Sequence, residues 1–445
     1  MKIKKILCTI LCLLLVVSPI NVLAATYVSD SQIVSFKTPV SHADTELLWS
    51  AKLGTSYKNA PSTQIVVGDT LIVMSGKKLL KINVKNGKTV KSADMVDVPS
   101  YSYTSPLYAD GVIYCPLDNA KIQAFNYKTM KSMWVYTDPL GGQSLTPITY
   151  DGGYIYTGFW NDEDRNANYV CLNVKDENAK ETHEAKKAVW SYKSLGGFYW
   201  AGCVTVGDNV IFGCDDGTVY ANKASKIVSL NKKTGKLTDT MPIVGDQRSS
   251  MTYSGGKLYF TTKAGYLYSV SLNSNGTFND SSAKRLSLGG ASTSTPLIYN
   301  GRLYLGVQGN GFGSGYFKVI NANNLSVIYS AQTKGYPQGR FLLSDAYLKD
   351  TGKVNVYITY NNNPGGITMF TDSANQTKAE SQELFTPADG QRNYCISSIV
   401  CDENGTLFYK NDSGYIFAVH TKTKKVSFFK RIFNAIAEFF RKLFG

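Results

Sequence analysis

A short unit of sequence recurs along most of this chain of 445 residues. Each unit contains a turn dipeptide that is followed at once by a strand rich in aromatic or β-branched residues, as in DGVIYC at 110, GGKLYFT at 255 and NGRLYLG at 300. The second turn residues lie 42 to 55 residues apart, at Asp69, Gly111, Gly153, Asp208, Gly256, Gly301, Gly352 and Gly405. Eight repeats at this spacing predict an array of similar structural units.

Two further kinds of strand surround this motif. One follows it and runs into a second turn, as in IVSLNKKTGK at 227, and one precedes it, often with Ser or Thr and Pro, as in TSTPLIYNG at 293. Each unit therefore has four short strands joined by hairpins. A single four-stranded sheet cannot bury both of its faces, whereas sheets arranged around an axis cover one another. The sequence predicts an all-β fold, an eight-bladed β-propeller over residues 46–428.

Closing such a ring often requires an outer strand from the other end of the chain. The segment ELLWSAKL at 46 to 53 resembles the outer strands that carry Trp134 and Trp190. We expect it to complete the last blade, with KKVSFF at 424 to 429 as the alternative strand for that position.

The first 25 residues have the pattern of a secretory signal. Lys2, Lys4 and Lys5 precede an apolar stretch, and VLAA offers a cleavage site after Ala24. Residues 26–45 then form an N-terminal lead. No small residue precedes Cys8 or Cys12, so lipidation is not expected, and no later apolar run reaches the about 20 residues of a membrane span. We expect a secreted protein on the outer side of the cell membrane.

The net charge and the cysteine content limit which ligands and cross-links can be expected. The net charge of +14 falls to +11 without the three signal lysines, and residues 421–445 hold +6 of it, which leaves +5 on the body. No basic stripe for nucleic acid is apparent. Six cysteines remain without a Cys/His cluster, so no zinc or other metal site is predicted. Cys203 and Cys214 form either a cross-strand disulfide or two buried small side chains.

The last 17 residues, 429–445, are predicted to form an amphipathic helix. Phe and Ile would occupy one face and Lys and Arg the other, as in a helix that lies in a membrane interface. The alternatives are that this face packs on the propeller or on a second copy of the chain. The predicted contact residues are Phe429, Ile432, Phe433, Ile436, Phe440, Leu443, Lys430, Arg431, Arg441 and Lys442.

The order of DG-x-[VIL]-Y, [IL]-x-[AS]-[FLV]-N and T-G-K with Trp resembles the repeats of the pyrroloquinoline-quinone-like propellers. That family includes quinoprotein alcohol dehydrogenases and a lipoprotein scaffold of outer-membrane barrel assembly. The resemblance implies, for an enzyme, a quinone between a tryptophan and a disulfide of neighbouring cysteines, with a cation held by Glu, Asn and Asp. No residue here matches those positions. We therefore expect a scaffold-type member without the quinone cofactor and assign no catalytic residue.

A propeller brings the segments that enter its innermost strands together at one axial mouth. Aromatic, Gln and Arg side chains there would suit a polar or anionic partner, a protein, a peptide or a glycan. The predicted mouth residues are Tyr57, Tyr101, Tyr103, Gln143, Tyr199, Trp200, Gln247, Arg248, Arg340, Arg392 and Tyr394. The acidic loop at 162–164 does not match a calcium-loop pattern and is interpreted as a solvated insertion.

Three functions are compatible with these features. The favoured one is a secreted or cell-surface, non-catalytic propeller that binds or scaffolds a partner and is attached by its C-terminal helix. The alternatives are a quinone-dependent dehydrogenase and a membrane-active or self-assembling protein that acts through its tail. No sequence pattern identifies the ligand.

Overall fold

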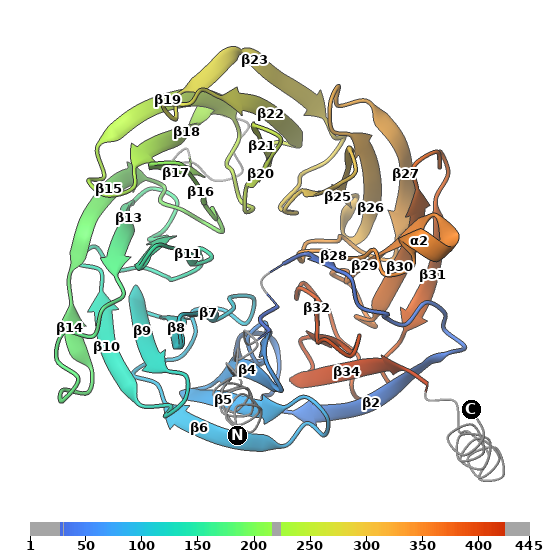
Figure 1. The fold of residues 1–445 in the computed structure, drawn as a ribbon, viewed down its shortest axis with the longest axis horizontal. Coiled ribbons are helices and arrows are strands. Elements are labelled where there is room, and N and C mark those ends of the chain that lie inside the picture. The colour runs from blue at the N-terminus through green and yellow to red at the C-terminus, as the bar shows by residue number, and fades with distance from the viewer. Residues whose placement is uncertain (1–26, 30, 216–223, 423–445) are drawn as a thin grey trace, which may run out of the picture.

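The structure is a ring of eight β-sheets around a central axis (Figure 1). It is a computed structural model that describes residues 27–29, 31–215 and 224–422. Six sheets have four strands and two have five. The predicted all-β, eight-bladed propeller is confirmed. The predicted secretory signal at 1–25 and C-terminal helix at 429–445 lie outside the described residues.

The blades are numbered 1 to 8 in chain order, and each contributes four antiparallel strands. The innermost strands are β3 (Ile65–Val67), β7 (Leu107–Ala109), β11 (Thr149–Asp151), β16 (Val204–Val206), β20 (Thr252–Ser254), β24 (Leu297–Tyr299), β28 (Leu342–Ser344) and β32 (Val400–Cys401). The second strands are β4 (Thr70–Ser75), β8 (Val112–Leu117), β12 (Tyr154–Gly158), β17 (Asn209–Gly213), β21 (Lys257–Thr262), β25 (Arg302–Gly309), β29 (Lys353–Ile358) and β33 (Leu407–Lys410).

The third and outer strands complete the blades. The third strands are β5 (Lys78–Asn83), β9 (Lys121–Asn126), β13 (Asn166–Asn173), β18 (Ala224–Asn231), β22 (Tyr266–Leu272), β26 (Gly311–Asn321), β30 (Ile367–Ser373) and β34 (Tyr415–Thr421). The outer strands are β6 (Thr89–Asp94), β10 (Ser132–Thr137), β15 (Ala188–Leu195), β19 (Leu237–Val244), β23 (Phe278–Ser287), β27 (Val327–Thr333), β31 (Glu380–Phe385) and β2 (Thr45–Lys52).

Two blades carry a fifth, parallel strand that the repeat did not predict. β1 (Ile33–Val34) pairs with β28 in blade 7, and β14 (Glu184–Lys186) pairs with β10 in blade 2. Short helices form at Tyr57–Asn59 (η1) and Leu348–Thr351 (α2). No helix in the described part of the chain is long and apolar enough to cross a membrane.

The turn dipeptides of the repeat form tight hairpins. In four of the eight, both residues adopt positive φ, and in the other four only the glycine does. Asp110 and Gly111 have φ of 47° and 79°, and Asn300 and Gly301 have φ of 46° and 74°. Two-residue hairpins need this backbone to match the twist of the strands, and Gly, Asn and Asp reach it at low cost. The predicted turn-and-strand unit is therefore the hairpin between the first and second strands of a blade.

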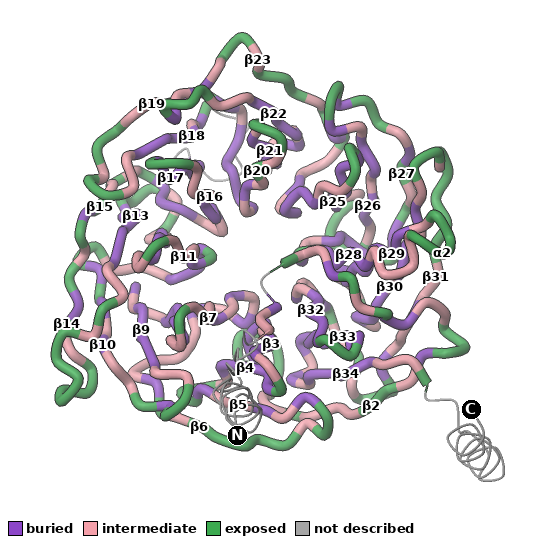
Figure 2. Tube along the Cα trace, viewed as in Figure 1, coloured by how far each residue is buried: buried purple, intermediate pink, exposed green. Residues whose placement is uncertain are grey.

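The core lies between neighbouring blades. In Figure 2 the buried residues concentrate on the middle strands, and the exposed ones lie on the outer strands and turns. Aromatic rings cross from blade to blade: Tyr169 stacks on Phe212 with 3.8 Å between ring centroids, and Phe317 stacks on Phe370 at 4.0 Å. Each sheet thus buries its faces on its neighbours, so stability depends on an unbroken ring.

The ring closes in blade 8, where β2 pairs antiparallel with β34 (Figure 1). The predicted closing strand is therefore confirmed, and the alternative at 424–429 is wrong for this position because β2 already fills it. Trp49 of β2 also reaches into blade 1, where its indole nitrogen donates a hydrogen bond of 2.7 Å to the carbonyl of Val84. The indole lies flat against Gly87, which has φ of +69°.

The six cysteines after the signal are all buried and free. Cys203 and Cys214 therefore do not form the disulfide that the sequence left open. They pack instead in the cluster between blades 3 and 4 that includes Tyr169 and Phe212. This is the alternative of two small buried side chains.

Gly87→Ala tests the contact that closes the ring. A Cβ at Gly87 would lie 2.6 Å from the Trp49 indole, whereas a Cβ at Gly76, which also has positive φ, meets nothing within 4 Å. Both substitutions carry the cost of a left-handed alanine, about 1 kcal/mol. We expect Gly87→Ala to lower the free energy of unfolding in urea by about 1–3 kcal/mol more than Gly76→Ala. Equal losses would contradict the packing of Trp49 on Gly87.

Candidate binding site at the mouth of the ring

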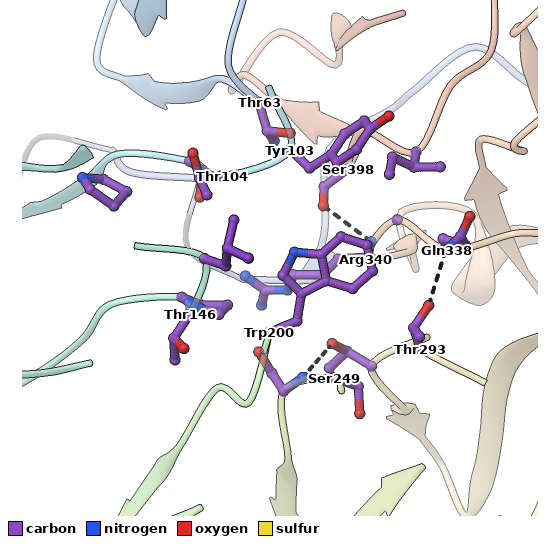
Figure 3. Close-up of a pocket in the computed structure, with 18 residues that line it drawn as sticks. Thr63, Tyr103, Thr104, Thr146, Trp200, Ser249, Thr293, Gln338, Arg340 and Ser398 are labelled. Carbon is purple, nitrogen blue, oxygen red and sulfur yellow. Dashed lines mark hydrogen bonds between the residues drawn. The ribbon is translucent and has the colours of Figure 1, made fainter. Parts of the chain in front are cut away.

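One end of the axis holds a small pocket to which all eight blades contribute (Figure 3). The segments that lead into the innermost strands end there, together with Pro116 of β8. The cavity volume is about 120 Å³. From blade 1 to blade 8, the lining includes Thr63, Thr104, Thr146, Trp200, Ser249, Thr293, Arg340 and Ser398.

The lining is rich in hydroxyl groups and has no acidic side chain among the described residues. Nine of its eighteen residues are Ser or Thr. They come from the segments that carry Ser or Thr before each innermost strand, a signal that was visible in the repeat but was interpreted only as part of a strand. Tyr103 and Arg340 are the two ionisable side chains that line it.

Trp200 lies across the pocket in Figure 3 and has a left-handed backbone with φ of 57°. This conformation is costly for a bulky residue and is often found where a side chain must be held in a binding site. Its ring touches those of Tyr199 and Tyr103, with centroids 4.9 and 6.2 Å apart. Tyr101 and then Tyr57 continue this row of aromatic rings outward from Tyr103.

The structure brings together part of the predicted mouth set. Tyr103, Trp200 and Arg340 line the pocket, and Tyr57, Tyr101 and Tyr199 lie in the adjoining row of rings. Gln143 pairs through its backbone with Trp160, whose ring contacts Tyr199. Tyr57, Arg340, Arg392 and Tyr394 are exposed. Gln247 and Arg248 are buried, so they lie beneath the surface of the mouth.

A buried lysine and aspartate hold Tyr103 in place. The Tyr103 hydroxyl donates to Asp412 at 3.2 Å, and the Lys410 ammonium donates to the other Asp412 oxygen at 3.2 Å. The same ammonium lies 4.8 Å from the Tyr103 ring centroid. Burial lowers the pKa of Lys410 and, together with Asp412, raises the pKa of Tyr103. The contacts of Tyr103 with Lys410 and Asp412 therefore hold this part of the aromatic row in place.

A second group of polar side chains surrounds Arg248 beside the mouth. One guanidinium nitrogen donates to Glu163 at 2.8 Å and to Asp215 at 2.6 Å, and it lies 3.3 Å from Asp246. The guanidinium also packs on the Tyr199 ring, 4.6 Å from its centroid. Burial raises the pKa of Asp215 well above its usual range, although Arg248 acts in the opposite direction.

This group corrects the interpretation of one residue of the acidic loop. Asp162 and Asp164 are exposed, as expected for a solvated insertion, but Glu163 turns inward and only 17% of its side chain is exposed. The loop between β12 and β13 is held there by the ion pair with Arg248. Glu163, Asp215 and Asp246 lie in three separate segments of the sequence, so no local pattern could have predicted that they meet.

The pocket does not fit the quinone and cation that the family resemblance implies for an enzyme. Trp200 offers one aromatic face, but the described cysteines are buried apart from the pocket and unpaired. A volume of about 120 Å³ is well below the roughly 300–1,000 Å³ of sites that enclose a small molecule. The three carboxylates that could hold a cation already surround the guanidinium of Arg248.

No family model and no curated relative matches the sequence. Solved structures match over most of the chain. BamB from Moraxella catarrhalis has a TM-score of 0.56 and 13% identity, with 86% of this chain and 99% of that chain covered. A europium-containing methanol dehydrogenase has a TM-score of 0.65 and 10% identity, with 88% and 96% covered.

Quinohemoprotein alcohol dehydrogenase from Comamonas testosteroni has a TM-score of 0.64 and 13% identity, with 88% of this chain and 79% of that chain covered. At these identities the likeness shows the fold, which is that of the pyrroloquinoline-quinone-type propellers. A computationally designed protein, Ika8, also matches, with a TM-score of 0.53. A shared fold of this kind does not decide between an enzyme and a binding protein.

Arg248→Ala tests whether the guanidinium takes the place of a cation. It would leave three carboxylates in a buried group, and we expect a loss of about 3–5 kcal/mol in the free energy of unfolding. Calcium should restore part of this loss in the variant, because oxygen ligands suit that ion, and should leave the natural protein unchanged. Arg302→Ala is the control, since Arg302 pairs with one carboxylate, Asp372. Equal rescue of both variants would contradict this assignment.

Proposed function

We propose that this protein is an exported, non-catalytic propeller that binds a protein partner at its mouth. The observation that carries the proposal is the pocket itself, where eight blades present hydroxyl groups and aromatic rings to one point on the axis. General acid–base chemistry needs positioned proton donors and acceptors near a substrate. The two ionisable side chains in the described lining, Tyr103 and Arg340, do not form such a pair.

The rim of the mouth has the composition of a protein interface. Tyr57 and Tyr394 are 50% and 48% exposed, and Arg392 lies beside Tyr394 in the sequence. Tyrosine, tryptophan and arginine are enriched among the residues that dominate binding energy between proteins. The dehydrogenase alternative is supported by the fold alone, which is shared with proteins of more than one kind.

Export and attachment belong to the proposal on the strength of the sequence. The secretory signal at 1–25 would direct the chain out of the cell, and the tail at 429–445 would attach the propeller to a membrane surface or to a partner. A mouth that faces away from this attachment would remain open to a partner in the cell envelope.

A photo-crosslinking amino acid at Tyr394 tests the mouth as the binding surface. Tyr253 is the matched control, because it is a tyrosine of similar exposure, 41%, on an innermost strand near the turn at the opposite end of the ring. In cells that make the full chain, we expect a defined crosslinked protein from position 394 and none from position 253. Tyr57→Ser in the same chain should lower the yield, as for a residue worth about 2 kcal/mol of binding.

Crosslinking from position 253 alone would contradict the proposal. So would a product from position 394 whose yield does not respond to Tyr57→Ser or Trp200→Ala. The folded state of each variant is checked by its urea unfolding curve.

A further inference from the structure

The size of the axial pocket limits what it can receive. At about 120 Å³ it is well below the roughly 300–1,000 Å³ of sites that enclose a whole small molecule. A pocket of this size takes one group at the end of a larger molecule. Because it lies on the axis and opens at the mouth, that group must enter end-on. This inference rests on the proposed function, since it concerns what the protein partner presents.

Several hydroxyl groups in the pocket are available for a ligand. The side-chain hydroxyls of Thr63, Ser105 and Ser250 make no hydrogen bond with any other described residue, and all three line the pocket. Each of these hydroxyls can exchange a hydrogen bond with water for one with a ligand.

Two further hydroxyls accept one hydrogen bond each and keep their proton available. Thr295 accepts one from the Ser250 backbone at 3.2 Å. Ser398 accepts one from the Arg340 backbone at 3.1 Å. A hydroxyl that already accepts can still donate its proton. These groups therefore offer donors to the pocket.

Apart from the hydroxyl oxygens, which can also accept, the described lining has a single uncharged side-chain acceptor. Gln338 carries the single side-chain amide of the lining, and both ends of that amide are engaged. Its carbonyl oxygen accepts from Asn361 at 2.8 Å, and its nitrogen donates to Thr293 at 3.3 Å. No carboxylate lines the pocket among the described residues, whereas Arg340 does. Hydroxyl groups accept as well as donate, so they would also serve a sugar, but a sugar carries no charge to complement the guanidinium of the lining. A carboxylate accepts from the hydroxyls and is an anion, so it fits better.

Most of the apolar side chains of the lining come from one side of the ring. Pro116 belongs to blade 2, and Leu145 and Pro147 lead into blade 3, beside the hydroxyls of Thr104, Ser105 and Thr146. In a ring of eight, these blades face blades 6 and 7, which supply Thr295 and Arg340. A ligand group that enters end-on therefore meets hydroxyls from every side, with apolar carbons concentrated at blades 2 and 3.

We propose that the pocket receives the C-terminal residue of a partner polypeptide. Its carboxylate accepts hydrogen bonds from the Ser and Thr hydroxyls near Arg340, and its side chain packs against Leu145 and Pro147. Capture of a chain end by a set of inward-facing donors is a known mode of peptide recognition. A single guanidinium in the lining matches a monoanion. The aromatic row from Trp200 to Tyr57 then contacts the preceding residues of the partner.

The test uses the mature protein and two pools of hexapeptides, labelled with fluorescein at the N-terminus and randomised at the last three positions. One pool ends in a free carboxylate and the other in an amide. Binding is measured by fluorescence anisotropy at 150 mM salt, a condition that screens non-specific attraction to a basic protein. We expect the acid pool to bind at least tenfold more tightly, since a hydrogen bond to a charged group contributes about that factor.

Pocket variants locate the binding. Ser250→Ala, Thr295→Val and Ser398→Ala, combined, should weaken the acid pool at least tenfold and leave the amide pool unchanged. The matched control combines Ser92→Ala, Thr89→Val and Ser330→Ala, which make the same kinds of change at exposed positions of outer strands. Urea unfolding shows whether each variant is folded.

Three results would overturn the inference: equal binding of the acid and amide pools, unchanged binding in the pocket variant, or binding of hexagalacturonate in preference to both peptide pools. A peptide pool with an amide end and one internal Glu distinguishes a side-chain carboxylate, whose tighter binding would also overturn it. The proposed function is judged separately. If crosslinking from position 394 persists in the pocket variant, the mouth binds a protein and only the assignment of the pocket fails.

Discussion

Closure of the ring by β2 and β34 is the interaction on which the rest of the structure depends. Each blade is a thin sheet whose apolar faces are buried by its neighbours, so an open ring would expose the faces of two blades at once. The chain prevents this by pairing a strand near its N-terminus with the last described strand. Trp49 then connects the closed blade to blade 1 through Val84 and Gly87. The axial mouth exists only because these contacts complete the circle.

The mouth shows how a repeated unit can make a non-repeated site. Every blade sends a similar segment toward the axis, yet the ends of these segments differ: hydroxyl groups dominate, Trp200 comes from the segment that leads into blade 4, and Arg340 from the one that leads into blade 7. The guanidinium of Arg248 balances the negative charge of the carboxylates around it. The proposal that the mouth binds a partner is based on these features, because the fold itself is shared by proteins of several kinds.

The sequence was sufficient to predict the features that repeat from blade to blade. It predicted far fewer of the features that occur only once. The spacing of the turn dipeptides predicted eight blades, and the likeness of residues 46–53 to the outer strands with Trp134 and Trp190 predicted the closing strand. The short parallel strands β1 and β14 were missed because two or three residues carry no periodic pattern. Asp215 and Asp246 meet Glu163 only through the packing of neighbouring blades, which no single stretch of sequence records. The mouth prediction identified aromatic residues but overlooked the hydroxyls beside them.

Hydrogen exchange of the backbone amides in β2 tests the closed ring most directly. If β2 closes blade 8, its amides should exchange as slowly as those of β15 and β19, outer strands that lie in hairpins of their own blades, because all would open only with a larger part of the ring. If the β2 amides instead exchange within seconds while β15 and β19 stay protected, the ring is open at this point. An open ring would not hold the segments of all eight blades together at one mouth, so the proposed binding site would not form.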